Sequence, residues 1–248
     1  MAPNTTPIAI VAGVGPGTGA AVARKFSAAY PVVLLARSPA NFESLAEEIN
    51  KAGGKAIGIS TDISDEASVK AAFEKIRKEY EDAPIAAAVF NAGGKFVRKS
   101  VMEQTVEEFG AGWHVGVKGA FIFSQAVLPG LLKHAENDPK HQPTLIFTGA
   151  TASIKANPLM AGFASSKFAL RALATSIAKE VAPKGVHVAH AVIDGVIDIP
   201  RTKDWLKDMP PEAKIGADDI ADAYWNLHLQ SKRCFSNEID IRPMLEKW

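Results

Sequence analysis

The sequence has few of the features that mark a secreted, metal-dependent or charge-driven protein. Its 248 residues include one cysteine, Cys234, which excludes an internal disulfide framework and a cysteine-rich zinc site. Lys and Arg number 28 against 27 Asp and Glu, so no excess charge draws the molecule to nucleic acid or an anionic membrane. No run approaches the roughly 18 apolar residues of a membrane span, and the N-terminus lacks a secretory signal pattern. We therefore expect a cytoplasmic protein that binds neither nucleic acid nor membrane.

Short apolar runs alternate along the chain with longer segments of helical periodicity. Between the runs, apolar residues recur every three or four positions, as at Leu170, Leu173, Ile177 and Val181, which is typical of helices. The alternation continues without a repeat, linker or break in composition. It predicts one α/β domain over residues 1–248, with a parallel sheet covered by helices on both faces. The expected strands cover residues 8–12, 32–36, 55–60, 85–90, 144–148 and 185–193, with a late helix and a last strand after residue 221.

A glycine-rich turn follows the first expected strand directly. A helix is predicted to begin near its Thr18. Bare glycine backbone lets a pyrophosphate approach closely, and the unpaired N–H groups at the start of the helix can bind it. Because the turn opens an alternating α/β chain, it stands in the context that a dinucleotide site requires. The residues predicted to hold the cofactor here are Gly13, Gly15, Gly17, Thr18 and Gly19.

The end of the second expected strand indicates which dinucleotide is bound. An NAD site usually places an acid about 20 residues beyond the glycines, where it holds the ribose hydroxyls. Here the chain reads Ala36-Arg37-Ser38. Arg37 and Ser38 supply hydrogen-bond donors that suit a 2′-phosphate. NADP(H) is therefore favoured over NAD(H).

Over nearly its whole length the chain resembles the short-chain dehydrogenase/reductase family. Gly13, Gly17 and Gly19 match its Gly-x-x-x-Gly-x-Gly turn. The Asp62-Ile63 pair resembles its adenine-contacting pair, and Asn91-Ala92-Gly93 is similar to the end of its Asn-Asn-Ala-Gly signature. The resemblance implies a Rossmann fold of about seven strands, with the nicotinamide over their carboxyl ends. It also implies a homodimer or homotetramer built on two long helices, here at about 104–133 and 160–182.

The loop after the sixth expected strand looks like the turn that receives the nicotinamide carboxamide in this family. Gly195 matches the glycine of that Pro-Gly turn, and Ile197 is expected near the cofactor. Asp194 replaces the proline, and Ile199 replaces a threonine that often touches the cofactor.

The sequence departs from the family at the catalytic residues. In the family a tyrosine protonates the carbonyl, and a lysine four residues later holds the nicotinamide ribose. A serine thirteen residues before the tyrosine orients the carbonyl, and an asparagine on the preceding helix anchors a water relay. Lys167 fits the lysine, whereas Phe163, Ala150 and Gly116 stand at the tyrosine, serine and asparagine positions. A hydroxyl near position 150 is an alternative to the serine, and the neighbours that offer one are Thr148, Thr151 and Ser153.

The loss of the tyrosine should impair ordinary ketone turnover, because a positioned general acid is worth about 100- to 10,000-fold. Another group could donate the proton: Lys167, if burial lowers its pKa, or one of His114, His190, Asp194 and Asp198.

Three functions therefore stay open. The first is an NADP(H)-dependent reductase of an imine, iminium ion or activated alkene or carbonyl, which needs no tyrosine acid. The second is a non-redox isomerase, lyase or cyclase with a dry site around Phe163, Phe96 and Trp205. The third is a catalytically inactive NADP(H)-binding protein. Trp205, Leu206 and Met209 of the expected specificity loop favour an apolar small-molecule substrate.

Overall fold

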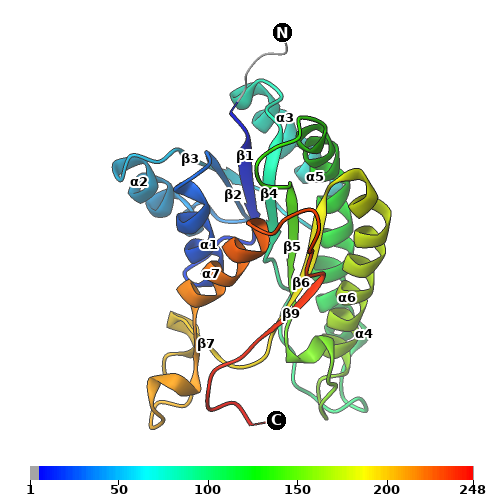
Figure 1. The fold of residues 1–248 in the computed structure, drawn as a ribbon. Coiled ribbons are helices and arrows are strands. Elements are labelled where there is room, and N and C mark those ends of the chain that lie inside the picture. The colour runs from blue at the N-terminus through cyan, green and yellow to red at the C-terminus, as the bar shows by residue number, and fades with distance from the viewer. Residues whose placement is uncertain (1–5, 248) are drawn as a thin grey trace.

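A parallel sheet of seven strands forms the centre of the computed structural model, which describes residues 6–247 (Figure 1). The strand order is β3-β2-β1-β4-β5-β6-β9, and every neighbouring pair is parallel. The strands are β1 Ile8–Ala12, β2 Val32–Ala36, β3 Ala56–Ser60, β4 Ile85–Phe90, β5 Thr144–Thr148, β6 His187–Ile193 and β9 Glu238–Ile241, with a separate pair of β7 Ile197–Asp198 and β8 Ile215–Gly216. The chain order reverses between β1 and β4, and such a reversal opens a crevice at the carboxyl ends of the two strands.

Helices cover both faces of the sheet (Figure 1). One face carries α1 Thr18–Ser27, α2 Glu43–Lys51 and α7 Ala217–His228; the other carries α3 Glu66–Tyr80, α4 Val106–Trp113, α5 Gly119–Glu136 and α6 Ala161–Val181. Successive side chains of a strand point to opposite faces. In β2, Val32 and Leu34 therefore pack in the core under the first layer, whereas Val33 and Leu35 pack in the core under the second.

The predicted α/β fold with about seven parallel strands is confirmed. Four strands match the predicted bounds, while the third and sixth begin one and two residues late. The predicted helix over about 104–133 is present as one continuous helix, Val106–Glu136, in which the π-helical turn His114–Lys118 joins α4 to α5. Four glycines between 110 and 119 weaken regular helix here. The other long helix, α6, lies within one residue of its predicted bounds.

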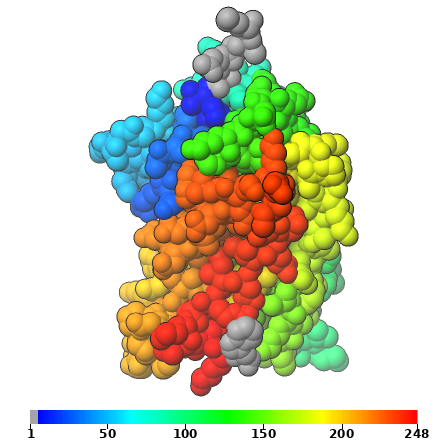
Figure 2. Space-filling model, viewed as in Figure 1, coloured from blue at the N-terminus to red at the C-terminus, as the bar shows by residue number. Residues whose placement is uncertain are grey.

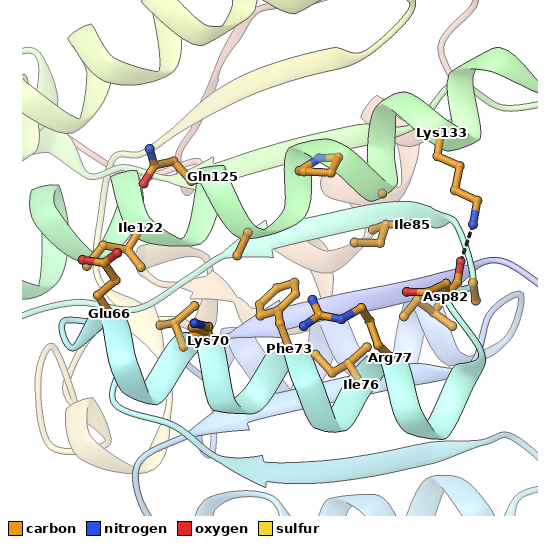
Figure 3. Close-up of a pocket in the computed structure, with 16 residues that line it drawn as sticks. Glu66, Lys70, Phe73, Ile76, Arg77, Asp82, Ile85, Ile122, Gln125 and Lys133 are labelled. Atoms are coloured by element: carbon orange, nitrogen blue, oxygen red, sulfur yellow. Dashed lines mark hydrogen bonds between the residues drawn. The ribbon is translucent and has the colours of Figure 1, made fainter.

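One hollow of about 550 Å³ lies between α3 and α5 (Figure 3). Phe73 and Ile122 lie along it, with Lys70, Arg77 and Lys133 at its charged rim. It also touches the first residues of β1 and β4. The hollow therefore lies toward the amino ends of the strands, away from the crevice at their carboxyl ends.

Candidate cofactor and catalytic site

The glycine-rich turn after β1 has the close backbone packing that only glycine permits. Gly13 has a φ of +87°, and a Cβ there would lie 2.4 Å from the backbone nitrogen of Ala92. A Cβ on Gly19 would lie 2.6 Å from the carbonyl oxygen of Gly13. The side chain of Asn91 fixes the turn by donating to the Gly13 carbonyl at 3.0 Å. Gly15 has open space around it, so its backbone stays accessible to a ligand.

A cleft of about 190 Å³ opens beside this turn. It brings together several residues predicted from the sequence, namely Gly13, Arg37, Asp62, Ile63, Asn91, Ala92 and Gly93. Asn41, which the sequence reasoning missed, also lines the cleft; its signal was a polar residue four positions after Arg37. The cleft leaves out Gly15, Gly17, Thr18, Gly19, Ser38, Lys167, Gly195 and Ile197.

The two charged residues of the cleft, Arg37 and Asp62, differ in whether their side chains already have hydrogen-bond partners. Arg37 is exposed at the end of β2 and makes no ion pair among the described residues. The carboxylate of Asp62 accepts from the hydroxyl of Ser64 at 2.7 Å and from its N–H at 2.9 Å. These hydrogen bonds lower the pKa of Asp62. Arg37 is thus the charge in the cleft that is available to an anionic ligand.

Lys167 lies on α6, one helical turn after Phe163, and its side chain reaches the carboxyl end of β5. Its Nζ donates to the carbonyl oxygen of Thr148 at 2.9 Å. Burial lowers the pKa of Lys167 to about 8. The Phe163 ring packs edge-to-face on Phe96, with ring centroids 5.0 Å apart. Lys167 thus lies on the same face of α6 as Phe163, and its ammonium can gain or lose a proton near neutral pH.

Two of the three hydroxyls that could replace a serine at position 150 are engaged elsewhere. Ser153 is fully buried, and its oxygen accepts from the N–H of Ala150 at 3.1 Å. The Thr148 hydroxyl accepts from Tyr224 at 2.8 Å. Thr151 makes no side-chain hydrogen bond within residues 6–247. Of the three alternatives, Thr151 alone keeps a free hydroxyl.

No tyrosine takes the place of Phe163 in the part of the chain that the structure describes. Tyr224 is buried on α7, where burial raises its pKa. The hydroxyl of Tyr30 is hydrogen-bonded to Nε2 of His228 at 2.8 Å. Tyr80 ends α3. The sequence has three tyrosines, and none of them lies on α6.

Gly116 lies buried in the π-helical segment that precedes α5. A Cβ on Gly116 would meet no heavy atom within 4 Å. Space for a side chain is therefore present at this position, although the chain places none there.

The candidate proton donors differ in their surroundings. His114 is exposed. Burial lowers the pKa of His190 to about 4. Asp198 forms an ion pair with Lys214 at 3.3 Å. The pKa of Lys167, lowered by burial to about 8, lies closer to pH 7 than that of His190, and a general acid works best near the working pH.

The C-terminal segment packs on the loop after β6, beside residues around 200–215 (Figure 2). Arg242 forms ion pairs with Asp194 at 3.3 Å and with Asp240. A Cβ on Gly195 would lie 2.7 Å from Cδ of Pro243. The N–H of Leu245 donates to the carbonyl of Glu212 at 3.2 Å. Asp194 thus fixes the end of the chain to this loop, and the sequence reasoning missed its partner Arg242.

Asp194→Pro is expected to lower the free energy of unfolding by about 1 to 3 kcal/mol. The N–H of Asp194 donates to the carbonyl of Ile241 at 2.8 Å, and proline removes both this hydrogen bond and the ion pair with Arg242. Urea unfolding measures the effect. Asp194→Asn keeps the N–H and its hydrogen bond to Ile241, so it should cost less than the proline variant. A proline variant as stable as wild type would contradict this role.

Comparisons with known proteins agree over almost the whole chain. Residues 7–210 match the family described as short chain dehydrogenase. An uncharacterized oxidoreductase of Staphylococcus epidermidis is 26% identical over 245 residues, covering 98% of this chain and 100% of the relative. A short-chain dehydrogenase structure from Rhodopseudomonas palustris is 33% identical, with a TM-score of 0.76, covering 95% of this chain and 98% of that one. A metagenomic short-chain oxidoreductase in complex with NADP is 24% identical, with a TM-score of 0.79, covering 97% and 98%.

Proposed function

The chain belongs to the short-chain dehydrogenase/reductase family, and we propose that it is an NADP(H)-dependent oxidoreductase with an altered catalytic site centred on Lys167. The observation that carries the proposal is the half-buried Lys167, one turn after Phe163 on α6, whose ammonium donates to the Thr148 carbonyl at 2.9 Å and has a pKa lowered to about 8. Gly116, Ala150 and Phe163 would supply no hydroxyl or amide to the substrate. Lys167 is then the polar group retained from the family's catalytic set.

The residues around the cleft fit a phosphorylated dinucleotide. The packing at Gly13 and Gly19 leaves no room for a side chain, and Gly15 presents open backbone, as a pyrophosphate-binding turn requires. Arg37 would hold the 2′-phosphate, with Ser38 and Asn41 nearby. Gly17 and Thr18 would hold the pyrophosphate. The residues that would hold the adenine and nicotinamide ends are Asp62, Ile63, Asn91, Ala92, Gly93, Lys167, Gly195 and Ile197. When bound, NADPH supplies the hydride.

Arg37→Asp is expected to weaken NADPH binding about 100-fold while NADH binding holds or improves. The change replaces a charge-assisted hydrogen bond to the 2′-phosphate by repulsion, and each such bond contributes about 1.5 to 3 kcal/mol. Titration calorimetry with both cofactors measures the ratio. Arg233→Asp alters an exposed arginine on the segment before β9, and should change neither affinity. Equal loss for NADPH and NADH would contradict the role of Arg37.

Lys167 restricts the substrates that fit this site. Hydride addition to an iminium ion gives a neutral amine and needs no proton. Reduction of an activated alkene or carbonyl needs one proton, which Lys167 or water can deliver. At pH 7 an amine with a pKa of about 8 is mostly protonated and so able to donate. The edge-to-face pair of Phe96 and Phe163 and the exposed Trp205, Leu206 and Met209 favour an apolar substrate.

The proposed function is tested by following NADPH oxidation with a panel of a cyclic imine, an apolar enone and a simple ketone. We expect turnover of the imine or enone, and a rate at least about 100-fold lower with the ketone. Enone reduction should fall above pH 8, as Lys167 loses its proton. Tight NADPH binding without oxidation of any compound would favour the inactive binding protein. Product formation without net cofactor oxidation would favour a non-redox isomerase, lyase or cyclase.

The surface of the α4 to α6 layer supports a homodimer or homotetramer. Phe109, Trp113, Phe121 and Phe168 are each between 37% and 48% exposed on these three helices. Large exposed apolar groups that gather on one face mark contact surfaces. Val106–Glu136 is long and apolar enough to cross a membrane, and we attribute its exposed apolar side to a second copy of the chain. The free Cys234 supports the proposed cytoplasmic location.

A further inference from the structure

His190 lies in β6, on the sheet face that carries α6. Val186 and Val188 belong to the core under α5 and α6, and side chains alternate along a strand, so His190 faces the same layer. Its side chain is 2% exposed. A Cβ on Gly149 would lie 2.4 Å from Nε2 of His190 and 2.6 Å from its Cε1. The imidazole therefore occupies the space that any side chain at position 149 would need.

The hydrogen bonds of His190 leave one nitrogen without a partner. Nδ1 lies 3.1 Å from Oε2 of Glu238, and the same carboxylate accepts from Nε and Nη2 of Arg171 at 2.6 and 2.7 Å. A carboxylate bound by an arginine acts as an acceptor, so Nδ1 carries the proton and Nε2 carries a lone pair. Nε2 is buried and has no hydrogen-bond partner among the described residues. A buried unpaired acceptor in a folded protein calls for a donor.

Lys167 offers unused donors beside the same stretch of backbone. A lysine ammonium has three N–H groups, and the hydrogen bond to the Thr148 carbonyl is the only one Lys167 makes within residues 6–247. Thr148 directly precedes Gly149, against which the His190 ring packs. The unused donors and the unpaired acceptor thus border two consecutive residues at the end of β5.

We propose that His190 is a positioning residue for Lys167, whose ammonium, bound to the Thr148 carbonyl in this structure, turns within the site to donate to Nε2 of His190 as well. The inference deepens the proposed function and rests on it, because it assumes that Lys167 is the catalytic group. A positioning role for His190 explains three features: the glycine at position 149, the unpaired Nε2, and the two hydrogen bonds by which Arg171 holds Glu238. His190 then holds the lysine from the sheet side, in a site where Gly116, Ala150 and Phe163 offer no polar group.

The charges around His190 keep its lone pair available. Burial lowers its pKa to about 4; the charge and hydrogen bond of Glu238 raise it, and the charges of Lys167 and Arg171 lower it. The imidazole is therefore neutral at pH 7. Lys167 has a pKa of about 8, lowered by burial, so the loss of one acceptor should change its protonation in an accessible pH range.

The proposal is tested by titrating Lys167 itself, without substrate or cofactor. In protein labelled with ¹³C at the lysine ε-carbon, the Lys167 signal is followed by NMR from pH 6 to 10, and Lys167→Arg identifies it. We expect a wild-type midpoint near 8. His190→Phe keeps a flat ring but removes the acceptor, and should lower the midpoint by about one pH unit, a tenfold change. His190→Gln can place an amide oxygen near the Nε2 position and should restore most of the shift.

His187→Phe is the matched control on the same strand. His187 is equally buried, but its nitrogens are bonded to the carbonyls of Leu227 and Ser236, so its loss should leave the Lys167 midpoint unchanged. An unchanged midpoint in His190→Phe, or equal shifts in both variants, would overturn the proposal. If His190→Phe does not fold, His190→Leu carries the same expectation. NADPH binding by the same wild-type sample separates the two claims: its absence would refute the proposed function, whatever the lysine titration shows.

Discussion

A variant with Gly116→Asn, Ala150→Ser and Phe163→Tyr is expected to reduce simple ketones at least about 100-fold faster than wild type. The change adds a phenol as proton donor, a hydroxyl to orient the carbonyl and an amide on the π-helical segment. A positioned general acid is worth about 100- to 10,000-fold in rate, so even a partly aligned tyrosine should be measurable. The rate of NADPH oxidation with a small ketone gives the result.

The structure favours this gain because the three positions can accept the new side chains. A Cβ on Gly116 would meet no heavy atom within 4 Å. Phe163 is only partly buried, so a para-hydroxyl can extend toward the site without entering the core. Lys167 stands one turn later with a lowered pKa, where its charge would favour the phenolate form of a tyrosine at position 163. Ala150 is likewise only partly buried.

Two controls identify the source of the gain. Phe163→Tyr alone should give the largest single share, because it adds the proton donor. Lys167→Met in the triple variant should remove most of the increase while leaving the fold intact. A folded triple variant that binds NADPH without any gain on ketones would show that these positions do not face the substrate. A wild-type rate equal to that of the triple variant on some substrate would exclude an inactive protein.

The sheet could be predicted closely from the sequence because each strand is a short apolar run between turn signals. β1, β2, β4 and β5 match the expected bounds, and the burial of every residue in β1 and β2 explains why these runs lack polar alternation. The π-helical turn at His114–Lys118 could not be predicted in the same way. Apolar periodicity continues through it, and the glycines between 110 and 119 weaken regular helix without specifying where the hydrogen-bond pattern changes.

Some features of the candidate site could also be predicted from local sequence, and others depend on contacts between distant residues. The glycine turn and Arg37 could be predicted from local spacing, because the turn and the strand end proposed to bind the cofactor are each contiguous in the sequence. The ion pair of Asp194 with Arg242 joins residues 48 positions apart, and Gly149 meets His190 from a neighbouring strand. No local pattern encodes such partners. They depend on which strands pair, in which register and with which rotamers.

Acid is expected to unfold the protein through its buried histidines, and His228 shows the reason most directly. Its Nδ1 lies 3.0 Å from the Thr144 hydroxyl, which donates to the Gln142 carbonyl, so this nitrogen must carry the proton. Its Nε2 then accepts from the Tyr30 hydroxyl at 2.8 Å. Burial, with smaller effects of His141, His134 and His187, lowers the pKa of His228 to about 3. The neutral ring thus satisfies both partners, and a second proton would break one hydrogen bond.

The sign of the pH dependence follows from these pKa values. A free histidine titrates near 6.5, whereas His190 and His228 stay neutral in the fold down to about 4 and about 3. The unfolded chain therefore binds more protons below pH 6.5, and stability falls from there toward these lower values. Each pKa unit corresponds to about 1.4 kcal/mol. Full titration of both groups would cost several kcal/mol, a large part of a typical stability of about 5 to 15 kcal/mol.

Urea unfolding at intervals from pH 7.5 to 4.5 should show a constant free energy of unfolding above pH 7 and a steep decline below pH 6.5. His228→Asn should lower the free energy of unfolding at pH 7.5, because Tyr30 loses its acceptor. It should also make the decline with falling pH less steep, by the slope that corresponds to at most one proton. His114→Asn changes an exposed histidine and should leave the slope as in wild type. Parallel curves for wild type and His228→Asn would place the acid sensitivity in other groups, with the carboxylates of the ion pairs as the alternative.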